Sequence, residues 1–193
     1  MTPLEAMADD SARRDDRVRL VVIYENCDAA RRARHAFQTQ PQQNGSVLSW
    51  SAHWWKFEML TIPTLRAMAA EEAAEADLLV VAPQGGEPLP REVLEWIATA
   101  LHNPSHPKGL LALMATSKEA RGMAPSVETE LGILAAHGAI PLWCIHLDTS
   151  DRWWCEPSYA KQDLEVVAHA VFSMVRSKLN PLLQGQLGDA VNP

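Results

Sequence analysis

Three short apolar runs, rich in β-branched and leucine residues, do most to limit what this chain can fold into. They are Val18–Tyr24, Leu78–Ala82 and Leu110–Ala115. A run that is apolar at nearly every position is typical of a strand buried on both faces of a parallel sheet. Two weaker runs, Ser46–Ser51 and Pro141–Leu147, bring the expected strands to five.

A helical segment follows each expected strand. Alternating strands and helices of this length predict a parallel sheet with right-handed crossovers and helices on both faces. We therefore predict an α/β fold, a three-layer αβα sandwich whose five-stranded parallel sheet has the order 2-1-3-4-5. The expected helices are 29–38, 63–76, one starting at Pro90, one carrying the apolar stripe from Val127 to Ala135, and 158–179.

Length and composition fit one globular domain. The chain has 193 residues, of which 47% are hydrophobic and 21% charged. One domain usually takes about 100–200 residues, and we expect it to span 17–180, with a mobile tail at 1–16 and an irregular tail at 181–193. No apolar run approaches the roughly 20 residues of a membrane-spanning helix.

Charge and cysteine usage exclude several function classes. The formal net charge is −7, which disfavours binding to nucleic acid or to an anionic membrane because both need a basic surface. The three cysteines are an odd number with no CxxC pair, so neither a disulfide framework nor a zinc site is supported. With no apolar stretch near the N-terminus, we expect a cytoplasmic protein.

The loops that follow the strands are the expected place for a ligand, because open parallel sheets bind ligands beyond the carboxyl ends of their strands. The polar and aromatic residues of these loops define a candidate ligand or interface site. Its members are Glu25, Asn26, Asp28, His53, Trp54, Gln84, Gly85, Gly86, Thr116, Ser117, Asp148 and Trp154.

The first of these loops is a poor phosphate site. It has no glycine, and the carboxylates of Glu25 and Asp28 would repel a phosphate. Either Asn26 or Asp28 can cap the helix that follows. We interpret Gln84-Gly85-Gly86 as a turn.

Other side chains have less specific interpretations. Arg31, Arg32 and Arg34 are expected largely on the outer face of the first helix. Cys144 lies inside an expected strand and is interpreted as a core residue.

Seven tryptophans against three phenylalanines and two tyrosines are unusual. Trp50, Trp96 and Trp143 are expected in the core. Trp54 and Trp55 fall in one expected loop and Trp153 and Trp154 in another, at the same edge of the sheet. Such an apolar edge needs a cover, and we favour self-association or an unidentified protein partner.

The segment Leu20–Asn26, the pair Thr116-Ser117 and the segment Ala136–Ala139 resemble a response-regulator receiver domain. The resemblance spans residues 18–147 and implies a flavodoxin-like fold. It implies an acidic pair, an acceptor Asp, a hydroxyl and a Lys in successive loops. The acidic pair is half present as Glu25-Asn26. Ala82-Pro83 stands at the acceptor position, and His146-Leu147-Asp148 offers no Lys, so the family's phosphoryl transfer does not carry over.

The segment Ala76–Gly86, with Leu89-Pro90 and Val93–Ile97 after it, is similar to flavodoxin-like FMN reductases. That resemblance implies FMN as a cofactor, flanked by tryptophans such as Trp54 and Trp154. These families hold the FMN phosphate in a Ser/Thr/Gly loop after the first strand, where this chain has Glu25 to Asp28.

The segment Trp55–Leu60, with the strand and helix downstream, also looks like a group of uncharacterised bacterial proteins of this shape. No catalytic residue, metal site or cofactor is identified. We therefore expect a non-catalytic, receiver-like binding or regulatory module without a phosphoacceptor; the alternative is a divergent FMN-binding reductase.

Overall fold

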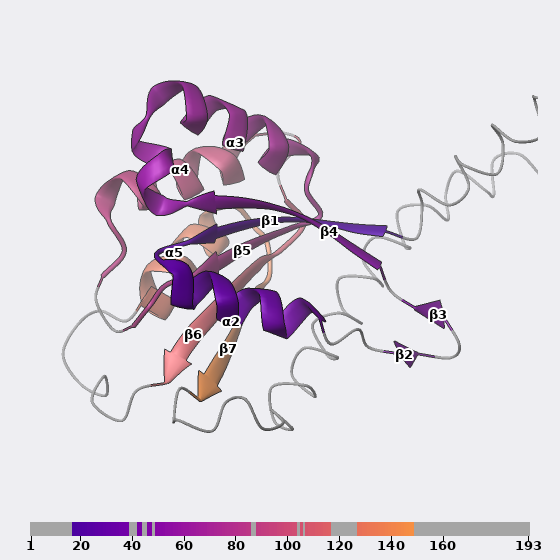
Figure 1. Cartoon of the computed structure of the whole chain (residues 1–193). Coiled ribbons are helices and arrows are strands. Elements are labelled where there is room, and N and C mark those ends of the chain that lie inside the picture. The colour runs from indigo at the N-terminus through magenta and orange to yellow at the C-terminus, as the bar shows by residue number, and fades with distance from the viewer. Residues whose placement is uncertain are drawn as a thin grey trace, which may run out of the picture.

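The structure is a computed structural model that describes residues 17–38, 42–43, 46–47, 49–85, 88–103, 105, 107–116 and 127–148. Five strands, all parallel, form one sheet in the order β4-β1-β5-β6-β7 (Figure 1). By position along the chain this is the expected order 2-1-3-4-5. The strands are β1 Arg17–Tyr24, β4 Ser49–Lys56, β5 Leu78–Ala82, β6 Leu110–Thr116 and β7 Leu142–Asp148.

Helices cover both faces of this sheet, which gives a three-layer α/β fold (Figure 1). Helix α2, Cys27–Gln38, lies on one face. The other face carries the 3-10 helix η1, Phe57–Thr61, and three α-helices: α3 Pro63–Glu75, α4 Arg91–His102 and α5 Val127–His137. Pro63 and Pro90 stand at the starts of α3 and α4, where a missing backbone N–H costs nothing.

The two faces of the sheet carry two cores, because successive side chains of a strand point to opposite faces. Along β1, Leu20 and Val22 pack under α2, whereas Val21 and Ile23 pack under the three-helix layer. Trp96 of α4 is buried in that second core, and its indole Nε1 donates to Arg66 O at 3.2 Å. The apolar runs of the sequence thus became strands buried on both faces, as predicted.

The second strand along the chain lies elsewhere than predicted. Ser46–Val47 is β3, which pairs antiparallel with β2, Gln42–Gln43, in a separate two-stranded sheet. The strand of the main sheet is β4, and it continues through His53-Trp54-Trp55 to Lys56. Aromatic side chains that alternate with polar ones are a strand pattern. The prediction of a strand at 46–51 followed by a loop with Trp54 and Trp55 was therefore wrong.

Asp77 fixes the opposite, amino-terminal end of the sheet. Its buried carboxylate accepts a hydrogen bond from the backbone N–H of Arg19 at 3.0 Å and pairs with the ammonium of Lys108. This charge therefore ties β1 to the segment that enters β6, and its burial is compensated.

The expected helix 158–179 and the expected tails 1–16 and 181–193 lie outside the described residues. Within the described part of the chain, no helix has the length and apolar character needed to cross a membrane.

Candidate functional site

The carboxyl ends of β1 and β5 form the topological switch point of the sheet, where ligands of open α/β folds bind. The chain leaves β1 into α2 on one face and leaves β5 toward α4 on the other. The loops after these two strands carry Glu25 to Asp28 and Pro83 to Gly85.

Asn26 is the cap of α2. Its side-chain Oδ1 accepts hydrogen bonds from the backbone N–H groups of Asp28 and Ala29, both at 3.1 Å. This is the geometry of an N-cap residue, which satisfies the free donors of a helix start. Of the two capping residues that the sequence allowed, the structure selects Asn26, and those two donors are therefore used by the chain itself.

Glu25 ties the two loops together. One carboxylate oxygen accepts a hydrogen bond from the backbone N–H of Gln84 at 2.6 Å, and the backbone N–H of Glu25 donates to Ala82 O at 3.1 Å. A backbone donor bonded to a carboxylate is a strong, charge-assisted contact. This contact occupies the backbone N–H of Gln84 in the second loop and a carboxylate oxygen of Glu25 in the first.

Arg32 of α2 also binds the loop that follows β5. Its Nη1 donates to Gln84 Oε1 at 3.1 Å and its Nη2 donates to Pro83 O at 2.9 Å. Only 9% of Arg32 is exposed, so placing it on the outer face of the helix was wrong, whereas Arg31 and Arg34 are exposed as expected.

The environment of Arg32 is unfavourable for a charge. Burial lowers the pKa of its guanidinium, and the carboxylates of Asp28 and Glu25 oppose that shift. Its buried Nε has no hydrogen-bond partner among the described residues. A sequence signal existed: Arg32 lies three residues after Ala29 and one before Ala33, within the buried stripe of α2.

His53 and Trp54 do not meet at this end of the sheet. They are successive residues of β4, paired with Val21 and Val22, so their side chains leave opposite faces. The Trp54 ring lies 6.3 Å from the ring of Tyr24 and 5.5 Å from the Arg34 guanidinium. His53 faces α3, where its Nδ1 lies 3.0 Å from Glu72 Oε1.

Trp55 also departs from the expected arrangement of loop tryptophans, because it is buried in the core under α3. Trp54 and Trp55 therefore do not gather on one apolar edge. Trp153 and Trp154 lie outside the described residues, as do Gly86 and Ser117.

The remaining site residues lie at strand ends. Thr116 and Asp148 are register partners at the carboxyl ends of β6 and β7. A Cβ placed on Gly85 would meet no atom of the described residues within 4 Å. No group of three or more His, Cys, Asp or Glu side chains among the described residues is arranged to hold a metal ion.

The two described cysteines are both exposed. Cys27 is the first residue of α2. Cys144 was expected in the core, but β7 is an edge strand of the sheet in the described part of the chain. Although the residue as a whole is exposed, partial desolvation of the Cys144 thiol, with a smaller contribution from the carboxylate of Glu128, raises its pKa, which disfavours the reactive thiolate form.

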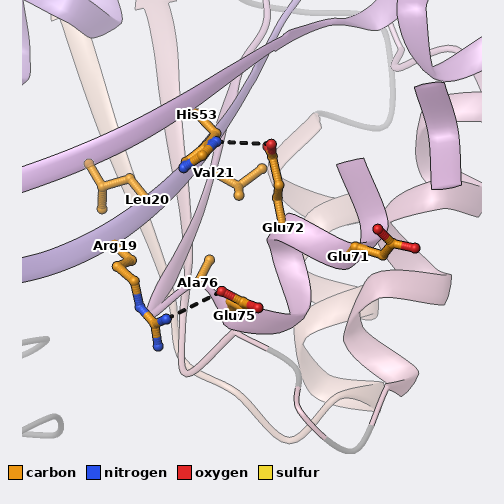
Figure 2. A pocket seen from close by; sticks show the side chains of 8 residues that line it. All are labelled: Arg19, Leu20, Val21, His53, Glu71, Glu72, Glu75 and Ala76. Atoms are coloured by element: carbon orange, nitrogen blue, oxygen red, sulfur yellow. Dashed lines mark ion pairs between the residues drawn. The ribbon is translucent and has the colours of Figure 1, made fainter. Parts of the chain in front are cut away.

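One cleft was not predicted from the sequence. It has a volume of about 230 Å³ and lies between α3 and the β1–β4 pair (Figure 2). Its charged lining comes from Arg19, His53 and the glutamates 71, 72 and 75 of α3. Arg19, His53 and the α3 glutamates come from three separate elements; the pairing of β4 with β1 brings Arg19 and His53 near each other, and α3 packs beside them.

Comparisons with known proteins add little to this geometry. No family model matches the chain, and no curated protein matches it in sequence. Among solved structures, the crystal structure of Smu.1420 from Streptococcus mutans UA159 is similar, with a TM-score of 0.47 and 10% identity, over 83% of this chain and 100% of that one. The class of the protein, a three-layer α/β fold with sheet order 2-1-3-4-5, therefore rests on its own strand order.

Proposed function

We propose that this chain is a non-catalytic binding or regulatory module of the cytoplasm, built on a flavodoxin-like, receiver-like scaffold and acting on a protein partner rather than on nucleic acid. The observation that carries the proposal is the hydrogen bond from the Gln84 N–H to the Glu25 carboxylate at 2.6 Å. It joins the two loops between which a doubly wound fold usually admits its ligand.

The same position argues against phosphoryl transfer. In receiver domains a carboxylate after the third strand accepts the phosphoryl group, and here Ala82 ends β5 with a buried methyl group. Glu25, which would hold half of the Mg²⁺ site, is already bonded to Gln84. At the end of β7, His146 Nε2 lies 2.6 Å from Glu128 Oε1 rather than offering a lysine ammonium.

An FMN-binding reductase is the competing proposal, and the first loop argues against it. A phosphate at this place needs free backbone N–H groups at the start of the helix. The side-chain oxygen of Asn26 already accepts hydrogen bonds from the backbone N–H groups of Asp28 and Ala29. A ligand phosphate would have to displace that cap and approach the carboxylates of Glu25 and Asp28.

Intact-mass spectrometry and flavin absorbance test both proposals on the purified full chain. After incubation with acetyl phosphate and Mg²⁺, we expect no gain of a phosphoryl mass, because the acceptor position is Ala82. We expect no flavin absorbance in the fresh protein and no thermal stabilisation by FMN, since a ligand of the native state stabilises it by RT ln(1 + [L]/Kd). A phosphorylated species would refute the proposal, and FMN that co-purifies or raises Tm would favour the reductase.

A further inference from the structure

The cleft beside α3 lies on a different surface from the switch point. Its floor is β1, where Leu20 and Val21 line it, and its walls are β4 and the second half of α3 (Figure 2). At about 230 Å³ it is smaller than the roughly 300–1,000 Å³ of small-molecule pockets. This volume suits a single long side chain better than a cofactor.

The cleft carries an excess of negative charge. Glu71, Glu72 and Glu75 occupy the last two turns of α3, which has no basic residue in its last turn. Carboxylates at a helix C-terminus oppose the helix dipole, and like charges four residues apart repel each other. This arrangement costs stability, and a bound cation would relieve the cost.

Arg19 and His53 neutralise only part of the negative charge of these glutamates. Arg19 Nη1 lies 3.6 Å from Glu75 Oε2, but both of these side chains are mostly exposed. Glu72 is engaged with His53 and Trp55. The carboxylate of Glu71 points away from these pairs (Figure 2) and has no hydrogen bond or ion pair among the described residues.

The strand β4 borders this cleft through His53. Within the described ranges, β4 is the terminal strand and pairs only with β1. An edge strand presents a row of backbone donors and acceptors on its free side, and extended peptides bind such edges by adding a strand. His53 links the two features, because it belongs to β4 and lines the cleft.

We propose that β4 is a docking edge for an extended basic segment of a partner protein. The segment pairs with the side of β4 that has no partner among the described residues, and it places one lysine or arginine side chain at the open side of the cleft, where Glu75 and the outward-pointing carboxylate of Glu71 can reach it. Charge complementarity selects this partner, since the cleft offers three carboxylates against one arginine and one histidine. The inference concerns a surface apart from the Glu25–Gln84 tie and does not depend on the function proposed for that site.

Fluorescence anisotropy of a labelled peptide with the full chain tests this inference. The probe is an eight-residue peptide of alternating lysine and valine, and its matched control carries glutamate in place of lysine. We expect the lysine peptide to bind, more weakly as salt is raised, and the glutamate peptide not to bind. Glu71→Gln should raise Kd about two- to fivefold, as for a partly exposed ion pair, while Glu92→Gln, at an exposed position on α4, should leave Kd unchanged.

A second pair of probes separates strand addition from simple charge attraction. Two lysine–valine peptides are N-methylated at alternate residues, one at the lysines and one at the valines. A paired strand uses only one of these two sets of N–H groups on its bonded side, so one peptide should lose about tenfold or more in affinity and the other much less. These probes need no protein variant and so test the edge even if a substitution were to unfold the chain.

Three results would overturn the inference: no binding of the lysine peptide, equal binding of the glutamate peptide, or equal binding of both N-methylated peptides. A fourth is self-association through this edge. If light scattering shows a dimer that Glu71→Gln dissociates, the occupant is a second copy of the chain rather than a basic partner.

Discussion

Glu72 holds the edge strand against α3, and its removal should destabilise the protein measurably. One carboxylate oxygen accepts the indole Nε1 of Trp55 at 2.7 Å, and the other lies 3.0 Å from Nδ1 of His53. Trp55 is 7% exposed, so Glu72→Ala leaves a largely buried donor without its charged acceptor.

The magnitude follows from the burial of the two contacts. A hydrogen bond between a buried donor and a charged acceptor contributes about 1.5–3 kcal/mol. The His53 side chain is 58% exposed, and an exposed pair of this kind contributes about 0–1 kcal/mol. We therefore expect Glu72→Ala to lower the free energy of unfolding by about 2–3 kcal/mol and Tm by roughly 5–10 °C for a chain of this size.

Urea unfolding followed by tryptophan fluorescence measures this loss. Glu71→Ala is the matched control, since it removes a neighbouring carboxylate of the same helix that has no bonded partner among the described residues. A double-mutant cycle of Glu72→Ala with Trp55→Phe isolates the indole contact, because phenylalanine lacks the N–H, and should give a coupling energy of about 1–2 kcal/mol. If Glu72→Ala costs no more than Glu71→Ala, or if the coupling energy is zero, the contact does not hold β4 to α3.

Two further predictions concern other parts of the fold. A Cβ on Gly109 would collide with the Trp143 ring and lie 3.2 Å from Leu78 Cδ1, so Gly109→Ala should cost about 1–3 kcal/mol by overpacking; Trp143→Leu in the same chain should recover part of that cost in urea unfolding, and no recovery would refute the assigned clash. Burial, and secondarily the Glu128 carboxylate, raise the pKa of the Cys144 thiol, so its alkylation by iodoacetamide, followed by peptide mass spectrometry, should become fast only above the pH typical of a free cysteine. Glu128→Gln should shift that profile to lower pH, and an unchanged profile would contradict the assignment.

The strand order was predictable because three strands are apolar on both faces. Val18 to Tyr24 and Leu78 to Ala82 leave no choice of buried side, so each must lie inside a sheet with helices above and below. Their alternation with amphipathic helices then leaves few topologies. The sequence is informative here because nearly every residue of these runs is apolar and buried, Arg19 being the exposed exception.

Edge strands carry weaker signals, and two of the wrong predictions, for the bounds of β4 and for Cys144, lie there. β4 has one partner in the described sheet and mixes Ser51 and His53 with tryptophans, so its composition resembles a loop and its bounds were misplaced. Cys144 was assigned to the core for the opposite reason. A cysteine among apolar neighbours looks buried, but β7 lies at the other edge of the described sheet.

Arg32 shows why the site was harder to predict than the fold. The hydrophobic pattern of α2 places position 32 near the buried face, whereas its charge argues for the surface. The conflict resolves only when the loop after β5 is in place, because Pro83 O and Gln84 supply the acceptors for the guanidinium. A charged residue that interrupts a buried helical stripe is therefore the sequence signal that marks this tie.

The cleft had no such signal, because it is formed by register rather than by any local pattern. His53 lies opposite Val21 only when β4 pairs with β1 in the observed register, and a shift by one residue would send it to the α2 face. The glutamates of α3 read in isolation as a solvated helix end. Within the described residues β4 is an edge strand, and α3 is tied to it through the contacts of Glu72 with His53 and Trp55. Neither the edge strand nor the acidic end of α3 would bind a basic strand by itself. The proposed docking needs the backbone groups of β4 and the carboxylates of α3 together.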